Sequence, residues 1–242
     1  MIKNIIVIPA RYKSTRFPGK VLVDLKGKPI IQYVYEQCLK SKLANKVIIA
    51  TDHQIVVDIC QTFTKDVIMT SEHHQSGTDR IAEVVSQFPS ENVVNIQGDE
   101  PFISPCLVDS LFEALKANIH PMVTAYHRID NFEELDNPNI VKVIFDSNQD
   151  AIYFSRFSIP YLRPPLTFKD MPFYRHIGVY GYKSEFLQSY VKMPHSSLEK
   201  AEQLEQLRVI EAGYKIKLIE TADISIGIDT PNDLELAKKK IG

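Results

Sequence analysis

Short apolar runs alternate with helix-like segments through the first half of the chain, and this alternation restricts the fold more than any other feature. The runs cover residues 5–9, 46–51, 67–70 and 92–97. They are short and rich in β-branched residues, which is typical of buried strands in a parallel sheet. The order of runs and helices predicts an α/β protein whose mostly parallel sheet is flanked by helices.

Helices are predicted for residues 29–40, 54–63 and 105–118, with a further helix beginning at Thr78. Pro29 suits a first helical position, and Thr78 is the predicted N-cap of its helix. The loop after each parallel strand leaves the sheet at its carboxyl edge, where ligands bind in such folds. The residues that follow the strands are therefore the first candidates for a site.

From about Met122 the pattern changes to strand-like stretches separated by Asp, Asn and Pro, without long helices between them. The stretches cover residues 123–129, 140–145, 151–155 and 173–182. They predict antiparallel pairs and a smaller β-rich insertion at about 129–194. A helix over 196–213 closed by Gly213, a strand at 215–220 and a helix beginning at Thr230-Pro231 complete one predicted domain, residues 1–242.

Composition excludes several classes of protein. Lys and Arg number 28 against 30 Asp and Glu, which gives a net charge of -2 and no field suited to a nucleic-acid backbone. The 3 cysteines are odd in number and widely spaced, so neither a disulfide framework nor a zinc site is expected. With no leader and no apolar run of the ~20 residues that span a bilayer, we expect a reduced, cytoplasmic protein without a membrane partner.

A cationic loop follows the first apolar run and carries Arg11, Lys13, Arg16 and Lys20. Its single glycine, Gly19, excludes both the G-x-G-x-x-G dinucleotide turn and the P-loop spacing. Side chains must therefore bind an anionic ligand here, if the loop is more than a solvated basic surface.

Two carboxylates could complete a phosphate site. Asp99 follows the fourth apolar run in a G-D-E-P turn, and Asp229 precedes Thr230-Pro231. Mg²⁺ takes one or two protein carboxylates and fills its other positions with phosphate oxygens and water, so the pair predicts magnesium. The alternatives are turn stabilisation by Asp99 and local helix capping by Asp229.

The second half offers a possible wall for a polyhydroxylated ligand. His176, Tyr180 and Tyr182 alternate along one strand and share a face, which could equally be a half-buried sheet face. Glu205 and Gln206 are placed on the predicted helix over 196–213, where solvent exposure is the simpler interpretation.

Taken together, these segments resemble the 3-deoxy-manno-octulosonate (Kdo) cytidylyltransferase family, the CMP-Kdo synthetases. The segments that carry the resemblance are IPARYKSTRFPGK, ATDH, HHQSGTDRIAEV, NIQGDEP, YFSR, RHIGVYGY, LEQLRV and GIDTPNDLE, in this order. The resemblance implies a nucleotide-diphospho-sugar transferase-like fold and a homodimer formed through the inserted region. It also implies transfer of CMP from CTP to Kdo with Mg²⁺, which supplies lipopolysaccharide synthesis.

The resemblance also assigns roles to residues of this chain. Those implied for catalysis are Lys20, Arg11, Arg16 and Asp99. Those implied for CTP are Ala10, Arg11, Arg16, Lys20, Gln75, Ser76, Gly77 and Arg80. Those implied for Kdo are Gln97, Arg156, His176, Tyr180, Glu205 and Gln206, with Asp99 and Asp229 as the magnesium ligands. Arg156 would pair with the sugar carboxylate.

Three alternatives remain open at this point. A cytidylyltransferase could act on 8-amino-Kdo or on sialic acid, and a non-catalytic nucleotide-binding module would use the same cationic loop. The segments YFSR, RHIGVYGY and LEQLR favour Kdo. The chain departs from the family at Lys13 and Phe17 and in a short proline-rich stretch after Ile159, which concerns the sugar-side lid and the dimer contacts.

Overall fold

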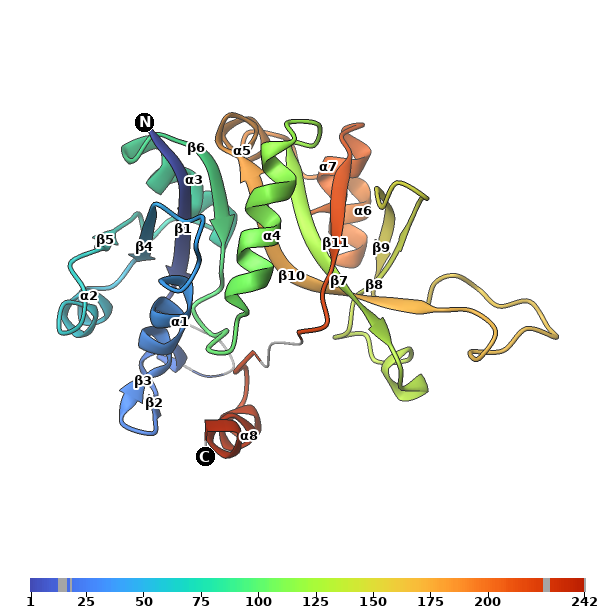
Figure 1. Cartoon of the computed structure of the whole chain (residues 1–242), viewed down its shortest axis with the longest axis horizontal. Coiled ribbons are helices and arrows are strands. Elements are labelled where there is room, and N and C mark those ends of the chain that lie inside the picture. Colours follow the sequence, from blue (N-terminus) through green and yellow to red (C-terminus); the bar gives the residue numbers. More distant parts are fainter. Residues whose placement is uncertain (13–16, 18, 224–226, 242) are drawn as a thin grey trace.

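The computed structural model describes residues 1–12, 17, 19–223 and 227–241, so the predictions for Lys13 and Arg16 lie outside the described residues. A nine-stranded sheet forms its centre, in the order β11-β7-β10-β6-β1-β4-β5, with β8 and β9 joined to it through β10 (Figure 1). The strands of this sheet are β1 (Ile2–Ala10), β4 (Lys46–Thr51), β5 (Val67–Met69), β6 (Ser90–Asn95), β7 (Met122–Ile129), β8 (Lys142–Phe145), β9 (Ala151–Ser155), β10 (Phe173–Lys183) and β11 (Ile216–Glu220). Separately, β2 (Asp24–Leu25) pairs with β3 (Lys28–Pro29).

The first half of the sheet is parallel, as the alternation predicts. β1 lies between β4 and β6, parallel to both, and β5 extends the sheet beyond β4. The inner residues of β1 are buried on both faces, which explains the continuous apolar run. The carboxyl ends of β1, β4, β5 and β6 therefore meet at one edge of the sheet.

Helices cover both faces of the sheet (Figure 1). The apolar sides of α1 (Ile30–Cys38), α2 (Gln54–Cys60), α4 (Pro105–Lys116) and α8 (Pro231–Ile241) pack into the core on one face. α3 (Gly77–Gln87), α5 (Ser184–Tyr190) and α7 (Leu207–Glu211) contribute to the core on the other. Two single turns, η1 (Lys20–Leu22) and η2 (Phe132–Glu134), and the short α6 (Ser197–Glu202) complete the elements.

Two local predictions are wrong. The N-cap of α3 is Ser76, whose Oγ accepts a hydrogen bond from the Asp79 N–H at 3.1 Å, while the Ser76 N–H donates to Asp79 Oδ2. This capping box places Thr78 inside the helix. The helix predicted over 196–213 is two helices, because Gln203 adopts a left-handed φ of 53° between α6 and α7. Gly213, with φ 81°, ends α7 as predicted.

The β-rich region is continuous with the main sheet. β10 pairs antiparallel with β6 at one end and with β7 along most of its length, and β8 pairs with β10 and β9. α5, inside the predicted insertion, packs against α3. The rest of the region, with η2 and the loop before β10, extends sideways as an arm (Figure 1). The arm exposes Phe157, Tyr161 and Leu166.

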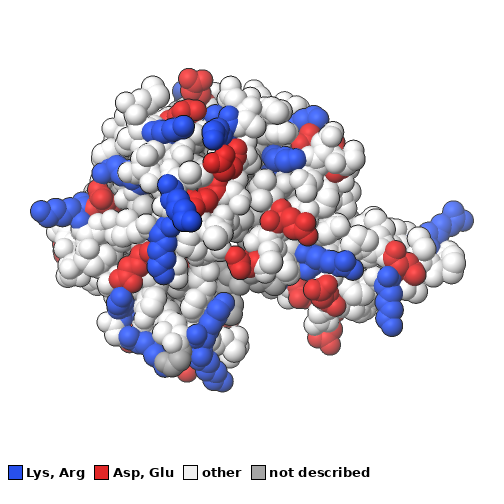
Figure 2. Space-filling model, viewed as in Figure 1, with Lys and Arg blue, Asp and Glu red and all other residues white. Residues whose placement is uncertain are grey.

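Charge is distributed without a single-sign stripe on the face in view. Figure 2 shows cationic side chains interspersed with anionic ones over this face. Among the described residues, the helices are too short or too polar to cross a bilayer.

The sheet contains a glycine whose replacement should be costly. A Cβ on Gly181 would lie 2.8 Å from Val123 Cγ2 and 3.0 Å from Leu115 Cδ1 in the core. We expect Gly181→Ala to lower the free energy of unfolding, measured with urea, by about 1–3 kcal/mol, as overpacked cores do. Gly178→Ala on the same strand is the matched control, since its Cβ would meet nothing within 4 Å. Equal stability of the two variants would contradict the packing described here.

Candidate active site

The loops at the carboxyl edge of the parallel strands bring together most of the predicted nucleotide residues. Ala10 ends β1, and the guanidinium of Arg11 reaches the loop before α3, where its Nη2 donates to the Gln75 carbonyl at 2.7 Å. Gly77 begins α3, and a Cβ there would lie 3.4 Å from Gln97 Nε2. The side chain of Ser76 is occupied by the capping box. The end of β1 and the start of α3 are thus neighbours at this edge, as the predicted cytidine side requires.

Lys20 joins the two carboxylates that the sequence predicts as magnesium ligands. Its Nζ donates to Asp229 Oδ1 at 2.7 Å and also to Asp99 Oδ2. Burial alone would lower the pKa of Lys20, but Asp99 and Asp229 outweigh it and raise the pKa above the ordinary value. The backbone supports the pair as well, since the Ile228 N–H donates to the Asp99 carbonyl at 2.9 Å.

The donor set at this point suits a hard divalent cation. Asp99 and Asp229 lie close enough to share one ammonium group, and both offer carboxylate oxygens. The described residues contain no cluster of three or more His, Cys, Asp or Glu side chains that would hold a metal alone. Two carboxylates with room for phosphate oxygens and water match Mg²⁺ better than a site made entirely of protein ligands.

A pocket of about 160 Å³ lies next to these loops, between α3, β10 and the α6–α7 break. Four residues predicted for the sugar line it: Gln97, Tyr180, Glu205 and Gln206. The sequence analysis assigned no substrate role to Thr78, Asn95 or Tyr190, which line it too. Two signals in the sequence pointed to this wall: the alternating tyrosines of β10 and the resemblance that implied Gln97, Glu205 and Gln206 for the sugar. Glu205 and Gln206 lie just after the break at Gln203, and all three residues line the pocket.

Glu205 is held within this pocket by hydrogen bonds from two elements. Its Oε2 accepts from the Thr78 hydroxyl at 2.8 Å, and its carbonyl accepts from the Tyr190 hydroxyl at 2.7 Å. Burial raises the pKa of Glu205, and the Thr78 hydrogen bond counteracts part of that effect. The simpler interpretation, solvent exposure of Glu205 on a helical face, is therefore excluded.

Gln206, which also lines this pocket, carries a buried donor without a partner in the part of the chain that the structure describes. The residue is 3% exposed, and within the described chain its Nε2 has no hydrogen-bond partner. Buried polar groups in folded proteins are nearly always hydrogen-bonded, so an unpaired amide in a pocket wall points to a polar ligand.

The sequence of the chain matches a known family over most of its length. The family described as Cytidylyltransferase matches residues 5–218. A 3-deoxy-manno-octulosonate cytidylyltransferase of Pseudoalteromonas translucida is 50% identical, covering 95% of this chain and 94% of that protein. A protein of the same name from Neisseria meningitidis serogroup C is 47% identical, covering 97% and 96%. The chain belongs to the 3-deoxy-manno-octulosonate cytidylyltransferase family.

Solved structures agree with this family. A CMP:2-keto-3-deoxy-manno-octonic acid synthetase complexed with CTP is 41% identical, with a TM-score of 0.93, covering 99% of this chain and 98% of that one. A 4-diphosphocytidyl-2C-methyl-D-erythritol synthase of Anaerococcus prevotii, 15% identical with a TM-score of 0.66, shares the fold alone. The predicted fold class, a nucleotide-diphospho-sugar transferase-like α/β sheet, is confirmed.

Two arginines predicted for substrates in this cytidylyltransferase are occupied by protein groups. Arg80 is fully buried, and its Nη2 donates to Asp52 Oδ2 at 2.9 Å. Arg156 donates from Nε to the Glu202 carbonyl at 2.7 Å and from Nη1 to the Pro138 carbonyl at 2.9 Å. Contact of either guanidinium with a substrate stays a prediction.

His176 lies behind the pocket wall, between the rings of Phe154 and Tyr180, whose centroids are 4.9 and 5.4 Å from its own. Its Nε2 is 2.9 Å from the Thr124 hydroxyl. Burial lowers the pKa of His176 to about 3, so the imidazole is neutral at working pH. It can thus contribute a hydrogen bond or packing, but no positive charge, to an acidic ligand.

The neutral state of His176 should appear in the pH dependence of stability. Below the unfolded pKa of ~6.5 the unfolded chain gains a proton that the folded chain does not take up, so stability falls as pH drops toward 3. Between pH 7 and 5 we expect the wild type to lose about 1–2 kcal/mol more than His176→Gln in urea unfolding. Comparing the slopes of unfolding free energy against pH removes any pH-independent loss of stability that the substitution causes. Parallel slopes would contradict a buried neutral imidazole.

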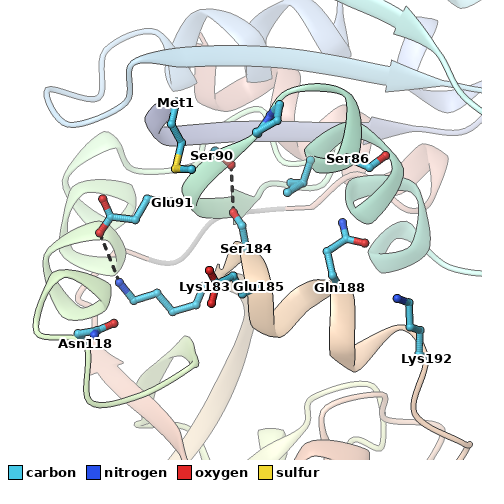
Figure 3. Close-up of a pocket in the computed structure, with 12 residues that line it drawn as sticks. Met1, Ser86, Ser90, Glu91, Asn118, Lys183, Ser184, Glu185, Gln188 and Lys192 are labelled. Carbon is cyan, nitrogen blue, oxygen red and sulfur yellow. Dashed lines mark hydrogen bonds and ion pairs between the residues drawn. The ribbon is translucent and has the colours of Figure 1, made fainter.

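A larger pocket of about 870 Å³ lies at the opposite, amino edge of the sheet, lined in part by Met1, Glu91, Lys183 and Glu185 (Figure 3). Two of its charges pair with each other, since Lys183 Nζ lies 3.7 Å from Glu91 Oε1. None of the predicted site residues lines it. The larger pocket therefore lacks, among its described lining residues, those that the chemistry requires. The carboxyl edge of the sheet, with Lys20 and Asp99, is the better candidate for the active site.

Proposed function

We propose that this chain transfers CMP from CTP to Kdo and releases pyrophosphate. The carrying observation is the arrangement of Lys20, Asp99 and Asp229 beside a pocket that contains the unpaired amide of Gln206. One half of this site suits a triphosphate and the other a polar sugar. The relatives of Pseudoalteromonas translucida and Neisseria meningitidis, 50% and 47% identical and named for this activity, support the same substrates.

In the proposed reaction the C2 hydroxyl of Kdo attacks the α-phosphorus of CTP in line with the leaving group. The new bond joins the C2 oxygen to phosphorus, the bond from phosphorus to the bridging oxygen breaks, and the hydroxyl proton passes to water. Because phosphoryl transfer needs mainly positioning and charge neutralisation, Arg11 and Lys20 would bind the triphosphate and offset the charge that grows on pyrophosphate.

Asp99 and Asp229 would hold Mg²⁺. The bound ion would offset the charge of the α-phosphate and lower the pKa of the attacking hydroxyl. On triphosphate binding, Lys20 would gain a third anionic partner in addition to Asp99 and Asp229. Gln97, Tyr180, Glu205 and Gln206 would orient the sugar by hydrogen bonds in the pocket.

A substrate panel tests this function. Purified protein with CTP and Mg²⁺ is given Kdo, 8-amino-Kdo or N-acetylneuraminate, and pyrophosphate release is followed for each. We expect release with Kdo to be the fastest. Faster release with another sugar would reassign the substrate, and no release with any of them would leave a nucleotide-binding module.

We also propose that the protein is a cytoplasmic homodimer that supplies lipopolysaccharide synthesis. The exposed apolar side chains of the arm support dimerisation, since Phe157 is 77% and Tyr161 83% exposed. Apolar patches of this kind commonly mark protein interfaces. Light scattering after size-exclusion chromatography would show a mass of one chain if the arm does not dimerise.

A further inference from the structure

We propose that Asp52 is a positioning residue for the triphosphate-binding loop, acting through Tyr12 and held in place by Arg80. The proposal rests on the proposed function for its ligand, CTP. Asp52 directly follows β4 and belongs to none of the predicted substrate contacts.

The carboxylate of Asp52 contacts two different elements. Oδ1 accepts a hydrogen bond from the Tyr12 N–H at 3.3 Å, and Oδ2 accepts one from Arg80 Nη2 at 2.9 Å. The side chain of Asp52 is 16% exposed and that of Arg80 is fully buried. A buried guanidinium requires a counter-charge, which here comes from Asp52.

Arg80 is a fixed support for this carboxylate. Its Nη1 donates to the Thr70 hydroxyl, and that hydroxyl donates to the Thr51 carbonyl at 2.9 Å. These contacts connect α3 to the ends of β4 and β5. The position of Asp52 is therefore determined by the sheet edge rather than by the loop that it contacts.

Tyr12 connects Asp52 to the cations that would bind the triphosphate. It follows Arg11 directly, and its carbonyl accepts a hydrogen bond at 2.9 Å from the N–H of Gly19, the neighbour of Lys20. Its ring stacks on His53 with centroids 4.1 Å apart. Tyr12 thus connects Arg11 to Gly19, the neighbour of Lys20, and its N–H donates to Asp52.

A displaced loop should weaken contacts to the β- and γ-phosphates more than contacts to the nucleoside. The ratio of the Kd for CMP to the Kd for CTP measures the affinity that the β- and γ-phosphates contribute. General destabilisation of the protein would lower the melting temperature but would not change this ratio selectively. In Asp52→Asn, which cannot offer a carboxylate to Arg80, we expect the ratio to fall about tenfold.

Asp52→Glu is the second variant, because it keeps the charge for Arg80 but moves the acceptor away from the Tyr12 N–H. We expect a near-normal melting temperature and a lowered ratio. Asp66→Asn is the matched control, since Asp66 also pairs with a cation, Lys46, at 2.7 Å, but away from the loop. Calorimetric titration with CMP and CTP measures both constants without turnover.

The outcomes separate this inference from the proposed function. A normal ratio in both Asp52 variants would overturn the positioning role, even if stability falls. Wild-type protein that binds CTP but transfers nothing to Kdo would overturn the function and leave the ratio test intact. Wild-type protein that binds neither nucleotide would overturn both.

Discussion

Replacing Asp99 with asparagine should lower kcat for pyrophosphate release by about a hundredfold to a thousandfold. The substitution keeps the size of the side chain but removes its charge, which Lys20 contacts and which a divalent cation requires. The backbone contact to Ile228 is unaffected, so circular dichroism and the melting temperature should remain close to wild type. The measurement is pyrophosphate release from CTP and Kdo over a titration of Mg²⁺.

The control for Asp99→Asn is Asp130→Asn, a carboxylate with an 81% exposed side chain on the arm, away from the site. It should retain near-normal turnover. Near-normal release by Asp99→Asn at saturating Mg²⁺ would mean that the carboxylate neither holds the metal nor positions Lys20.

Lys20→Met is expected to have an effect of similar size on a different parameter. Methionine keeps much of the length of the side chain but removes the ammonium that would contact the triphosphate, so kcat/KM for CTP should fall about a hundredfold or more. Without nucleotide, the variant leaves Asp99 and Asp229 facing each other without their shared cation, which should also lower the melting temperature at low divalent salt. Steady-state kinetics with CTP as the varied substrate, together with thermal melts, measure both effects.

Lys28→Met is the matched control, because Lys28 also pairs with a carboxylate, Glu36 at 2.8 Å, but is partly exposed and lies on the β2–β3 hairpin. Its kcat/KM should stay near wild type. If Lys20→Met and Lys28→Met behaved alike, the shared ammonium would have no catalytic importance.

The positions of the strands could be predicted from the local sequence pattern. β4 and β9 occupy the predicted residues, and the other main strands differ by only a few. Burial on both faces leaves a continuous apolar run, and a buried run is visible in the sequence itself. The start of α3 could not be predicted in this way. Ser and Thr are both good N-cap residues, and Ser76 is the N-cap because its N–H also donates to the Asp79 carboxylate.

The break at Gln203 lay beyond sequence reasoning for a different reason. Residues 196–213 have a helical pattern, and the left-handed residue in the middle is a glutamine rather than a glycine. Tertiary contacts stabilise the break, since Thr78 and Tyr190 both bind Glu205 there. Gln203, Glu205 and Gln206 all line the pocket, so the position of the break shapes its wall, and the sequence alone did not predict that break.

The sequence by itself determined the α/β class, and it predicted the carboxyl edge of the sheet as the site, with residue types suited to a nucleotide and a metal. These follow from periodicity, strand ends and ordered motifs, all of which are local. Only the tertiary structure decided which residues meet. Lys20 and Asp229 are 209 residues apart in sequence, but Lys20 Nζ lies 2.7 Å from Asp229 Oδ1. Arg80, which the sequence predicts as a CTP residue, forms an ion pair with Asp52. Such contacts depend on how the sheet brings distant loops together. Pairing between side chains that are far apart in sequence produces no periodic pattern from which it could be predicted.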